Sequence, residues 1–163
     1  AVASRKYLVQ ACSPITGMSA EYAEFDGSPM SRKLGWSNDR HDWFYSDSYR
    51  TAANIGLDYE WFGIDEGQCA AVDRLQEFLL EDARRNQFHT YEINGTVAQS
   101  DVLHPVAIIA TVAQGSLAAN NPFMNEWIER FWNTPMRTGV RRYYDNCLYF
   151  FAFLALSGKY RIW

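Results

Sequence analysis

Asp47 and Arg50 are the residues of this chain whose types and spacing best suit acid–base chemistry. They belong to the segment 46–62, where a helical period of about 100° per residue aligns Asp47, Arg50, Asn54, Asp58 and Trp61 along one side. The opposite side carries small and apolar residues, so both sides of this helix are expected to be covered. We therefore expect the aligned carboxylates to face a cavity rather than bulk solvent.

Asp47 stands where the N-cap of that helix is expected, and Arg50 follows one turn later. Free backbone N–H groups and a guanidinium would both favour an ionised carboxylate at this place. The plainer interpretation is a helix cap with a solvated i,i+3 ion pair, which is the commoner use of such a spacing. The spacing alone leaves both interpretations open.

The composition indicates one globular domain with a sizeable core: 163 residues, 48% of them hydrophobic and 16% aromatic. Aromatic side chains in such excess suit stacking on sugar rings or nucleobases. A net charge of -4 argues against a duplex nucleic acid partner, since the densest basic group is only Arg137, Arg141 and Arg142.

Cys12, Cys69 and Cys147 are odd in number and lack metal-ligand spacing, which predicts neither a disulfide framework nor a zinc site. We interpret them as small buried hydrophobic residues. His41 and His89 have no partners at metal or triad spacing, and we interpret both as surface residues. The apolar run 148–156 is too short to span a bilayer, so a core helix is expected there.

Six helices are predicted, at 1–11, 47–62, 65–85, 105–120, 122–133 and 142–156. Asn94-Gly95 predicts one small β-hairpin, and residues 15–45 form a long irregular stretch of the kind that is often functional. Most of these helices are largely apolar. Together they carry more apolar surface than six helices can bury against one another. The chain is therefore expected to be part of a larger helical assembly, and its first residues look like the middle or end of a helix.

Four blocks in this order resemble the C-terminal half of glycoside hydrolase family 8, especially its xylan-active members: SDSYRTAANIGLDYEWF, HPVAIIATVAQGSLAA, FWNTP and RYYDNCLYFFAFLALSGKYRIW. The resemblance implies an all-α fold, with residues 1–163 as the second half of an (α/α)6 barrel of twelve helices. The N-terminal half of that barrel would then be the chain's partner, either as a separate chain or as missing sequence. The resemblance implies neither a metal nor an organic cofactor.

The resemblance also implies an inverting mechanism, in which a Glu acts as general acid and an Asp as general base for an attacking water. The two carboxyl groups of such enzymes stand about 6.5–9.5 Å apart. The family's base lies in an Asp-x-x-Arg motif that Asp47-Ser48-Tyr49-Arg50 matches, although Ser46 and Ser48 replace its usual Tyr and Ala. The family's acid lies in the N-terminal half, so Glu21, Glu24 and Glu60 are not assigned to that role.

Two further sets of residues are substrate-binding candidates. In the family a tyrosine near this position reaches the sugar next to the cleaved bond, and the resemblance implies this role for Tyr144, chosen over Tyr143, with Arg142 or Asp145 fixing its environment. Core packing is equally open to either tyrosine. In the family's oligoxylanases, the loop that ends at Leu103 and His104 closes the cleft beyond the leaving sugar, although His104 could instead cap the next helix.

Tyr22, Phe25 and Trp43 are candidates for stacking on sugars, with packing inside their own loop as the alternative. Asn54 and Asp58 could bind sugar hydroxyls or form a buried structural network.

The resemblance thus implies hydrolysis of β-1,4-xylosidic bonds in xylooligosaccharides or xylan, with release of xylose from the reducing end. Endo-xylanase, endoglucanase and chitosanase activities are alternatives within the enzyme class, and a noncatalytic carbohydrate-binding fragment is the alternative outside it. Without its N-terminal half the chain would lack the acid and be inactive. An oligoxylanase would be expected in the cytoplasm and an endo-xylanase outside the cell, and the sequence leaves this open.

Overall fold

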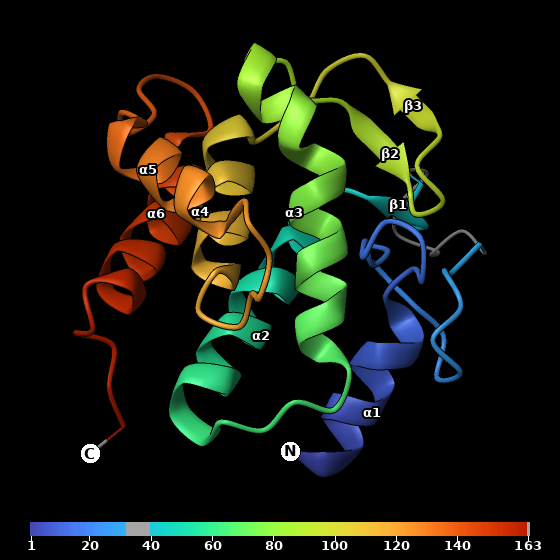
Figure 1. Ribbon diagram of the computed structural model, residues 1–163. Coiled ribbons are helices and arrows are strands. Elements are labelled where there is room, and N and C mark those ends of the chain that lie inside the picture. The colour runs from blue at the N-terminus through green and yellow to red at the C-terminus, as the bar shows by residue number, and fades with distance from the viewer. Residues whose placement is uncertain (32–39, 163) are drawn as a thin grey trace.

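A computed structural model describes residues 1–31 and 40–162, which form six α-helices, one 3-10 helix and three short strands (Figure 1). In chain order these are α1 (Val2–Ala11), β1 (Trp43–Phe44), η1 (Ser46–Tyr49), α2 (Arg50–Phe62), α3 (Gln68–Arg85), β2 (Thr90–Glu92), β3 (Val97–Gln99), α4 (Pro105–Gly115), α5 (Met124–Asn133) and α6 (Arg142–Leu156). The prediction of an all-α fold with six helices is confirmed.

Helix α4 ends earlier than the sequence pattern predicts, at Gly115 instead of residue 120. Its apolar residues continue into a tighter turn, where the N–H of Ser116 bonds to the carbonyl of Ala113 and that of Ala118 to Gly115. The pattern of apolar residues does not distinguish this i,i+3 bonding from an α-helix, so it places the end of the helix too late.

Helix α4 forms the centre of the molecule and packs against α2, α3, α5 and α6. Gly56 of α2 makes the closest approach, because a Cβ there would stand 2.3 Å from the carbonyl oxygen of Gln114. The Gln114 side chain donates from Nε2 to the carbonyl of Ala53, 3.1 Å away, which ties the two helices together at the same level. Small residues at this level therefore allow α2 and α4 to pack closely.

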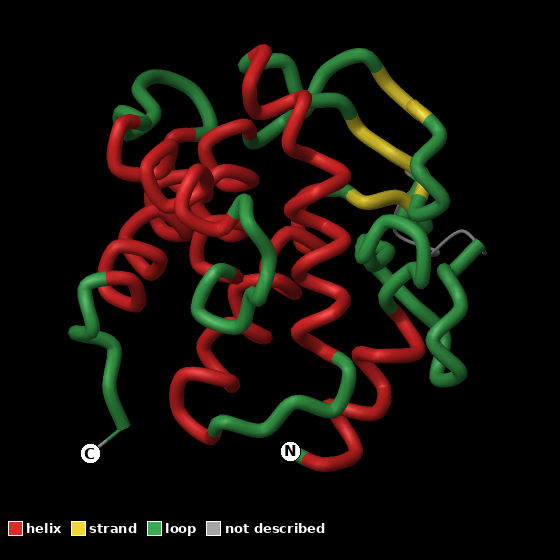
Figure 2. The backbone as a smooth tube through the Cα atoms, viewed as in Figure 1, coloured by secondary structure: helices red, strands yellow, loops and turns green. Residues whose placement is uncertain are grey.

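A three-stranded antiparallel sheet lies on the side of α3 away from α5 and α6 (Figure 2). The predicted hairpin of β2 and β3 is present, with a bulge at Thr90 and Tyr91, but β1 adds a third strand through the pairs Trp43–Glu92 and Phe44–Tyr91. A strand of two residues has no period to detect, which is why the sequence gives no sign of it. β1 leads directly into η1, so the sheet fixes the approach of the chain to Asp47.

Helix α6 is buried on one side only. Asp145, Ala152 and Ala155 are its buried residues, whereas Tyr143 is 82% exposed and Phe150 is 55% exposed. The prediction that some helices leave apolar surface uncovered is confirmed for this helix.

Of the three cysteines, Cys12 is buried, and Cys69 and Cys147 are only half-buried, which corrects the expectation that all three lie in the core. Burial raises the pKa of the Cys12 thiol to about 11, so it is not a reactive thiolate. None of the described helices has the length and apolarity needed to cross a membrane.

Candidate functional site

Asp47 lies inside η1, not at the N-cap of α2 as predicted. The chain enters η1 through Ser46, whose φ of +39° is unusual for a residue with a side chain. The Ser48 hydroxyl accepts a hydrogen bond from the Tyr45 N–H at 2.9 Å, so a neighbour of Asp47 performs the capping. The unusual backbone at Ser46 and the cap at Ser48 thus flank Asp47 on both sides along the chain.

The Asp47 carboxylate has two described partners. Arg50 approaches Oδ2 with Nη2 at 3.1 Å, as the spacing predicted, and the Tyr144 hydroxyl lies 3.4 Å from Oδ1. The Asp47 side chain is 40% exposed, so within the described residues it faces an open surface and not the predicted cavity. A carboxylate held from two sides and open on the third is free to contact a water or substrate.

Asp58 and Trp61, at the other end of the predicted polar stripe, make structural contacts. Asp58 accepts two hydrogen bonds from Arg5 of α1, at 2.6 and 2.8 Å, and these bonds hold the pKa of the Asp58 carboxyl below its usual range. Trp61 donates from its indole to the carbonyl of Tyr160, 3.0 Å away. The stripe therefore divides into a solvent-facing end at Asp47 and a structural end at Asp58, and Asn54 is exposed between them.

Tyr144 is the tyrosine that reaches the Asp47 region. Its hydroxyl donates to the carbonyl of Ser46 at 2.8 Å, which stabilises the unusual backbone just before Asp47. Burial and, next, the Asp47 charge raise the pKa of the Tyr144 phenol well above its usual value, so it remains a neutral donor. Tyr143 is largely exposed.

His104 is buried and makes no capping bond at the start of α4, contrary to one of its two predicted roles. Its Nδ1 lies 2.8 Å from Oδ2 of Asp145, and its ring centre lies 4.4 Å from that of Tyr144. Leu103, the residue before it, is half-buried, and its carbonyl accepts a hydrogen bond from Arg137 at 2.7 Å. The structure thus joins Leu103, His104 and Tyr144 into one group that ends at Asp47.

Asp145, rather than Arg142, fixes the surroundings of Tyr144. Arg142 is exposed and donates to the carbonyl of Gly139 at 2.9 Å, away from the tyrosine ring. Arg137 was missed as a site residue, because the sequence shows it only as one member of a basic cluster. Arg137 is distant from Leu103 in the sequence and has no helical spacing to Asp145. The sequence therefore does not indicate that these three residues are in contact.

The three aromatic stacking candidates differ in their surroundings. Tyr22 is half-buried and packs edge-on against His41, with ring centres 4.8 Å apart. Trp43 belongs to β1, where the Arg40 guanidinium lies 5.1 Å from its ring centre, and Phe25 projects fully into solvent. None of the three has a hydrogen bond or ring contact with Asp47 or Tyr144 in the described part of the chain.

His41 is buried and paired with Glu21, with Nδ1 2.6 Å from the carboxylate, so its interpretation as a surface residue is wrong. His89 is half-buried beside the hairpin, where Nδ1 lies 3.0 Å from the carbonyl of Ser100. These contacts give both histidines, and Glu21, a structural role at the sheet.

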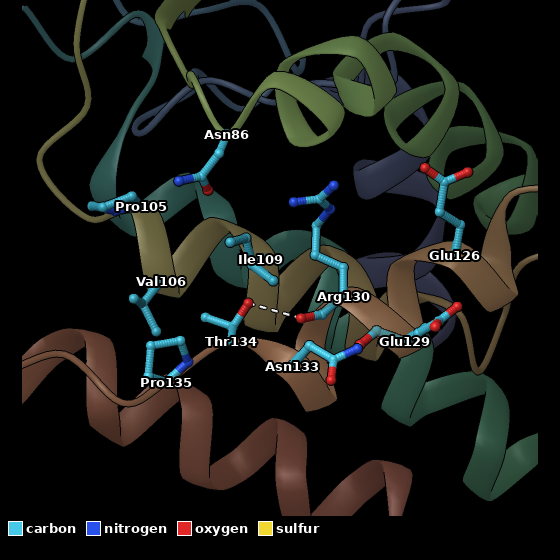
Figure 3. A pocket seen from close by; sticks show the side chains of 10 residues that line it. All are labelled: Asn86, Pro105, Val106, Ile109, Glu126, Glu129, Arg130, Asn133, Thr134 and Pro135. Atoms are coloured by element: carbon cyan, nitrogen blue, oxygen red, sulfur yellow. Dashed lines mark hydrogen bonds between the residues drawn. The ribbon is translucent and has the colours of Figure 1, made fainter.

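A separate cavity of about 610 Å³ lies where the end of α3 meets α4 and α5 (Figure 3). Its lining includes Asn86, Ile109, Arg130 and two carboxylates, Glu126 and Glu129. Two hydrogen bonds from Arg84 to Glu126, each 2.9 Å, hold the pKa of that carboxyl below its usual range. A general acid needs the opposite shift, so Glu126 is not suited to that role.

Among the described residues, no group of three or more His, Cys, Asp or Glu side chains is arranged to hold a metal ion.

Comparison with known proteins gives matches over the whole chain. It is 50% identical over 163 residues to the reducing-end xylose-releasing exo-oligoxylanase Rex8A of Paenibacillus barcinonensis, and 53% identical over 168 residues to the corresponding enzyme of Bifidobacterium adolescentis. These alignments cover 100% and 99% of the chain but 42% of each relative, so the chain spans less than half of their length. No family model matches the chain.

Solved structures agree with these relatives. A Rex8A variant in which a Leu-His pair is replaced superimposes with a TM-score of 0.91 at 48% identity, covering 98% of this chain and 41% of the other. Rex8A in complex with xylose gives a TM-score of 0.90 at 49% identity, with the same coverage. A reducing-end xylose-releasing exo-oligoxylanase variant in complex with xylobiose gives 0.89 at 48% identity.

Fold and sequence together therefore define this chain as a homologue of the C-terminal part of the helical glycoside hydrolases of family 8. Within that family its relatives are the reducing-end xylose-releasing exo-oligoxylanases. The resemblance indicated by the four sequence blocks is confirmed.

Proposed function

We propose that this chain is the C-terminal half of an inverting β-1,4-glycoside hydrolase that releases xylose from the reducing end of xylooligosaccharides. The observation that carries the proposal is the match of the whole chain, at about 50% identity, to three proteins named for that activity. Residues 1–163 would form the complete barrel together with an N-terminal half. That half would be about as long as the part of each relative that lies outside the alignment.

Asp47 is the general base in this proposal. Its carboxylate is open to solvent on one side and held on the others by Arg50 and by the neutral Tyr144 hydroxyl. The base would remove a proton from a water molecule as that water attacks the anomeric carbon, while a general acid from the N-terminal half protonates the leaving oxygen. Arg50 and Tyr144 would orient the carboxylate and contact the sugar at the cleaved bond.

Leu103 and His104 form the wall beyond the leaving sugar in this proposal, and Tyr22, Phe25 and Trp43 are its candidate stacking residues. The packing of His104 on Tyr144 supports the first assignment, because it places the end of the loop beside the group that contains Asp47. A wall at this place would leave room for one sugar past the cleaved bond, which accounts for release of single xylose units.

The test is product analysis with the complete protein and xylotriose labelled at its reducing end. We expect label to appear in free xylose, and we expect reduction of that end to the alditol to slow cleavage strongly. Internal cleavage of long xylan with equal efficiency would instead indicate an endo-xylanase, and binding without turnover would indicate a noncatalytic carbohydrate-binding protein.

A further inference from the structure

A fully buried carboxylate, Asp145, joins three segments of the chain beneath the candidate site. Its Oδ1 accepts a hydrogen bond from the backbone N–H of Ala107 in the first turn of α4, at 2.9 Å. Its Oδ2 is contacted by Nδ1 of His104 at 2.8 Å and by Nη1 of Arg137 at 2.7 Å. Buried charges require partners of this kind, and here Arg137 supplies the opposite charge.

Arg137 holds the loop before α4 as well as the carboxylate. The same Nη1 donates to the carbonyl of Leu103 at 2.7 Å. The backbone of Arg137 is itself fixed by Asn146, whose side chain accepts from its N–H and donates to its carbonyl, both at 2.9 Å. One arginine anchored at its own backbone therefore fastens the Leu103–His104 turn to α6.

These contacts determine which nitrogen of His104 carries the proton. An ionised carboxylate only accepts hydrogen bonds, so Asp145 requires the proton of neutral His104 on Nδ1 and leaves a lone pair on Nε2. In the described part of the chain no hydrogen bond reaches Nε2. The Tyr144 ring packs against the imidazole, with the ring centres 4.4 Å apart and the ring planes tilted by 41°.

We propose that Arg137 and Asp145 are positioning residues that hold the Leu103–His104 turn in place and keep His104 in the tautomer whose Nε2 accepts a hydrogen bond from a sugar hydroxyl. This inference rests on the proposed function, in which Leu103 and His104 form the wall beyond the leaving sugar. A purely structural network would stabilise α4 against α6 but would have no influence on how the enzyme treats the reducing end.

The first test is the tautomer, read in the complete protein from ¹⁵N spectra with labelled histidine. We expect Nδ1–H in the wild type. Asp145→Asn should move the proton to Nε2, because the amide oxygen is needed by the Ala107 N–H and its NH₂ group then faces His104. Asp82→Asn is the matched control, since Asp82 accepts a hydrogen bond from Tyr91 on the far side of α3 and should leave His104 unchanged. Nε2–H in the wild type would overturn the proposal.

The second test is selectivity for the reducing end, measured as the ratio of kcat/KM for xylotriose to that for its alditol. Arg137→Lys keeps the charge, but its side chain is one bond shorter than the path to Nη1, and Asn146 holds the backbone of residue 137 in place. The lysine ammonium is therefore not expected to reach both Leu103 and Asp145, and the variant remains informative if Asp145→Asn does not fold. We expect kcat/KM for xylotriose to fall on the order of 10²-fold, because the Leu103–His104 turn would no longer be placed correctly against the reducing end. The loss for the alditol should be smaller.

Arg84→Lys is its control, because Arg84 forms a comparable paired contact with Glu126 on the surface. A folded Arg137→Lys variant with wild-type selectivity would overturn the positioning role. A wild type that does not release xylose would instead overturn the proposed function, and the tautomer test would still decide whether Asp145 positions His104.

Discussion

Helices α4 and α6 are both strongly apolar, yet they are covered very differently. Every residue of α4 from Ala107 to Gly115 is buried, because four other helices surround it. In α6 only three residues are buried, and aromatic side chains cover its outer side. A helix of this composition buries its whole circumference in a stable protein, so the outer side of α6 is where the rest of the proposed barrel would pack.

Polar side chains are also treated differently around the two helices. Polar groups beside α4 are satisfied internally, as Gln114 and Gln76 are by backbone carbonyls of neighbouring helices. At the start of α6, by contrast, Asp145 contacts His104, and the Tyr144 hydroxyl lies beside the half-exposed carboxylate of Asp47. The closed side of the molecule holds it together, and the half-exposed Asp47 is the proposed base.

The largest expected effect is on the open side. Asp47→Asn keeps the shape of the side chain and removes its basicity, so turnover by the complete protein should fall about 10²–10⁴-fold while xylooligosaccharide binding stays within a few fold. Initial rates and calorimetric binding measure the two quantities. Asp65→Asn is the control, since Asp65 is exposed and accepts hydrogen bonds from the backbone N–H groups of Gly67 and Cys69, in the turn before α3. Unchanged turnover would remove Asp47 from the mechanism.

The second-largest expected effect concerns the exposed aromatic side of α6. Replacing Phe150 and Phe153 by Ser should reduce self-association of the 163-residue chain, measured by light scattering, because both are more than 40% exposed there. In the complete protein each replacement should cost about 3 kcal/mol of unfolding free energy, since the rings would be buried. Val97→Ser on the outer strand β3 is the control. A monodisperse wild-type chain would contradict the half-barrel account.

The closed side is tested at Gly56. A methyl group there would stand 2.3 Å from the carbonyl oxygen of Gln114, which is a backbone atom of the buried helix α4. Gly56→Ala should therefore lower the free energy of unfolding by about 1–3 kcal/mol, measured by urea denaturation. Asn54→Ala, exposed on the same helix, should be neutral or slightly stabilising. Equal stability of the two variants would mean that α2 and α4 are less tightly packed than described.

The smallest effect concerns the ion pair of Arg5 and Asp58. Arg5 holds the pKa of Asp58 below its usual range, so the pair contributes stability above the unfolded pKa of about 4 and loses it as the pH falls through the lower folded pKa. Asp58→Asn should lower the Tm at pH 7 and converge with the wild type in acid. A Tm difference that persists unchanged at low pH would show that packing, not charge, is involved.

The sequence predicts the six helices well because their apolar periods extend over ten or more residues. It fails at η1, where the Asp47 segment looks like a helix start and Ser46 has a backbone conformation that its residue type does not suggest. The pairing of Asp47 with Arg50 is local and was predictable. Arg137, Asp145 and His104 come together only through the packing of α6 on α4, so their side-chain types alone could not have placed them.

In the proposed mechanism Asp47 activates the water that attacks the sugar. Asp47→Ala, prepared in the complete protein, removes the base and opens space at its position, so added azide can take the place of the activated water. We predict that azide restores cleavage of xylotriose and yields the α-configured xylobiosyl azide, because azide attacks from the side of the missing base while the leaving xylose is protonated as before. A β-configured azide, or an Asp47→Ala enzyme that cleaves normally without azide, would contradict the account.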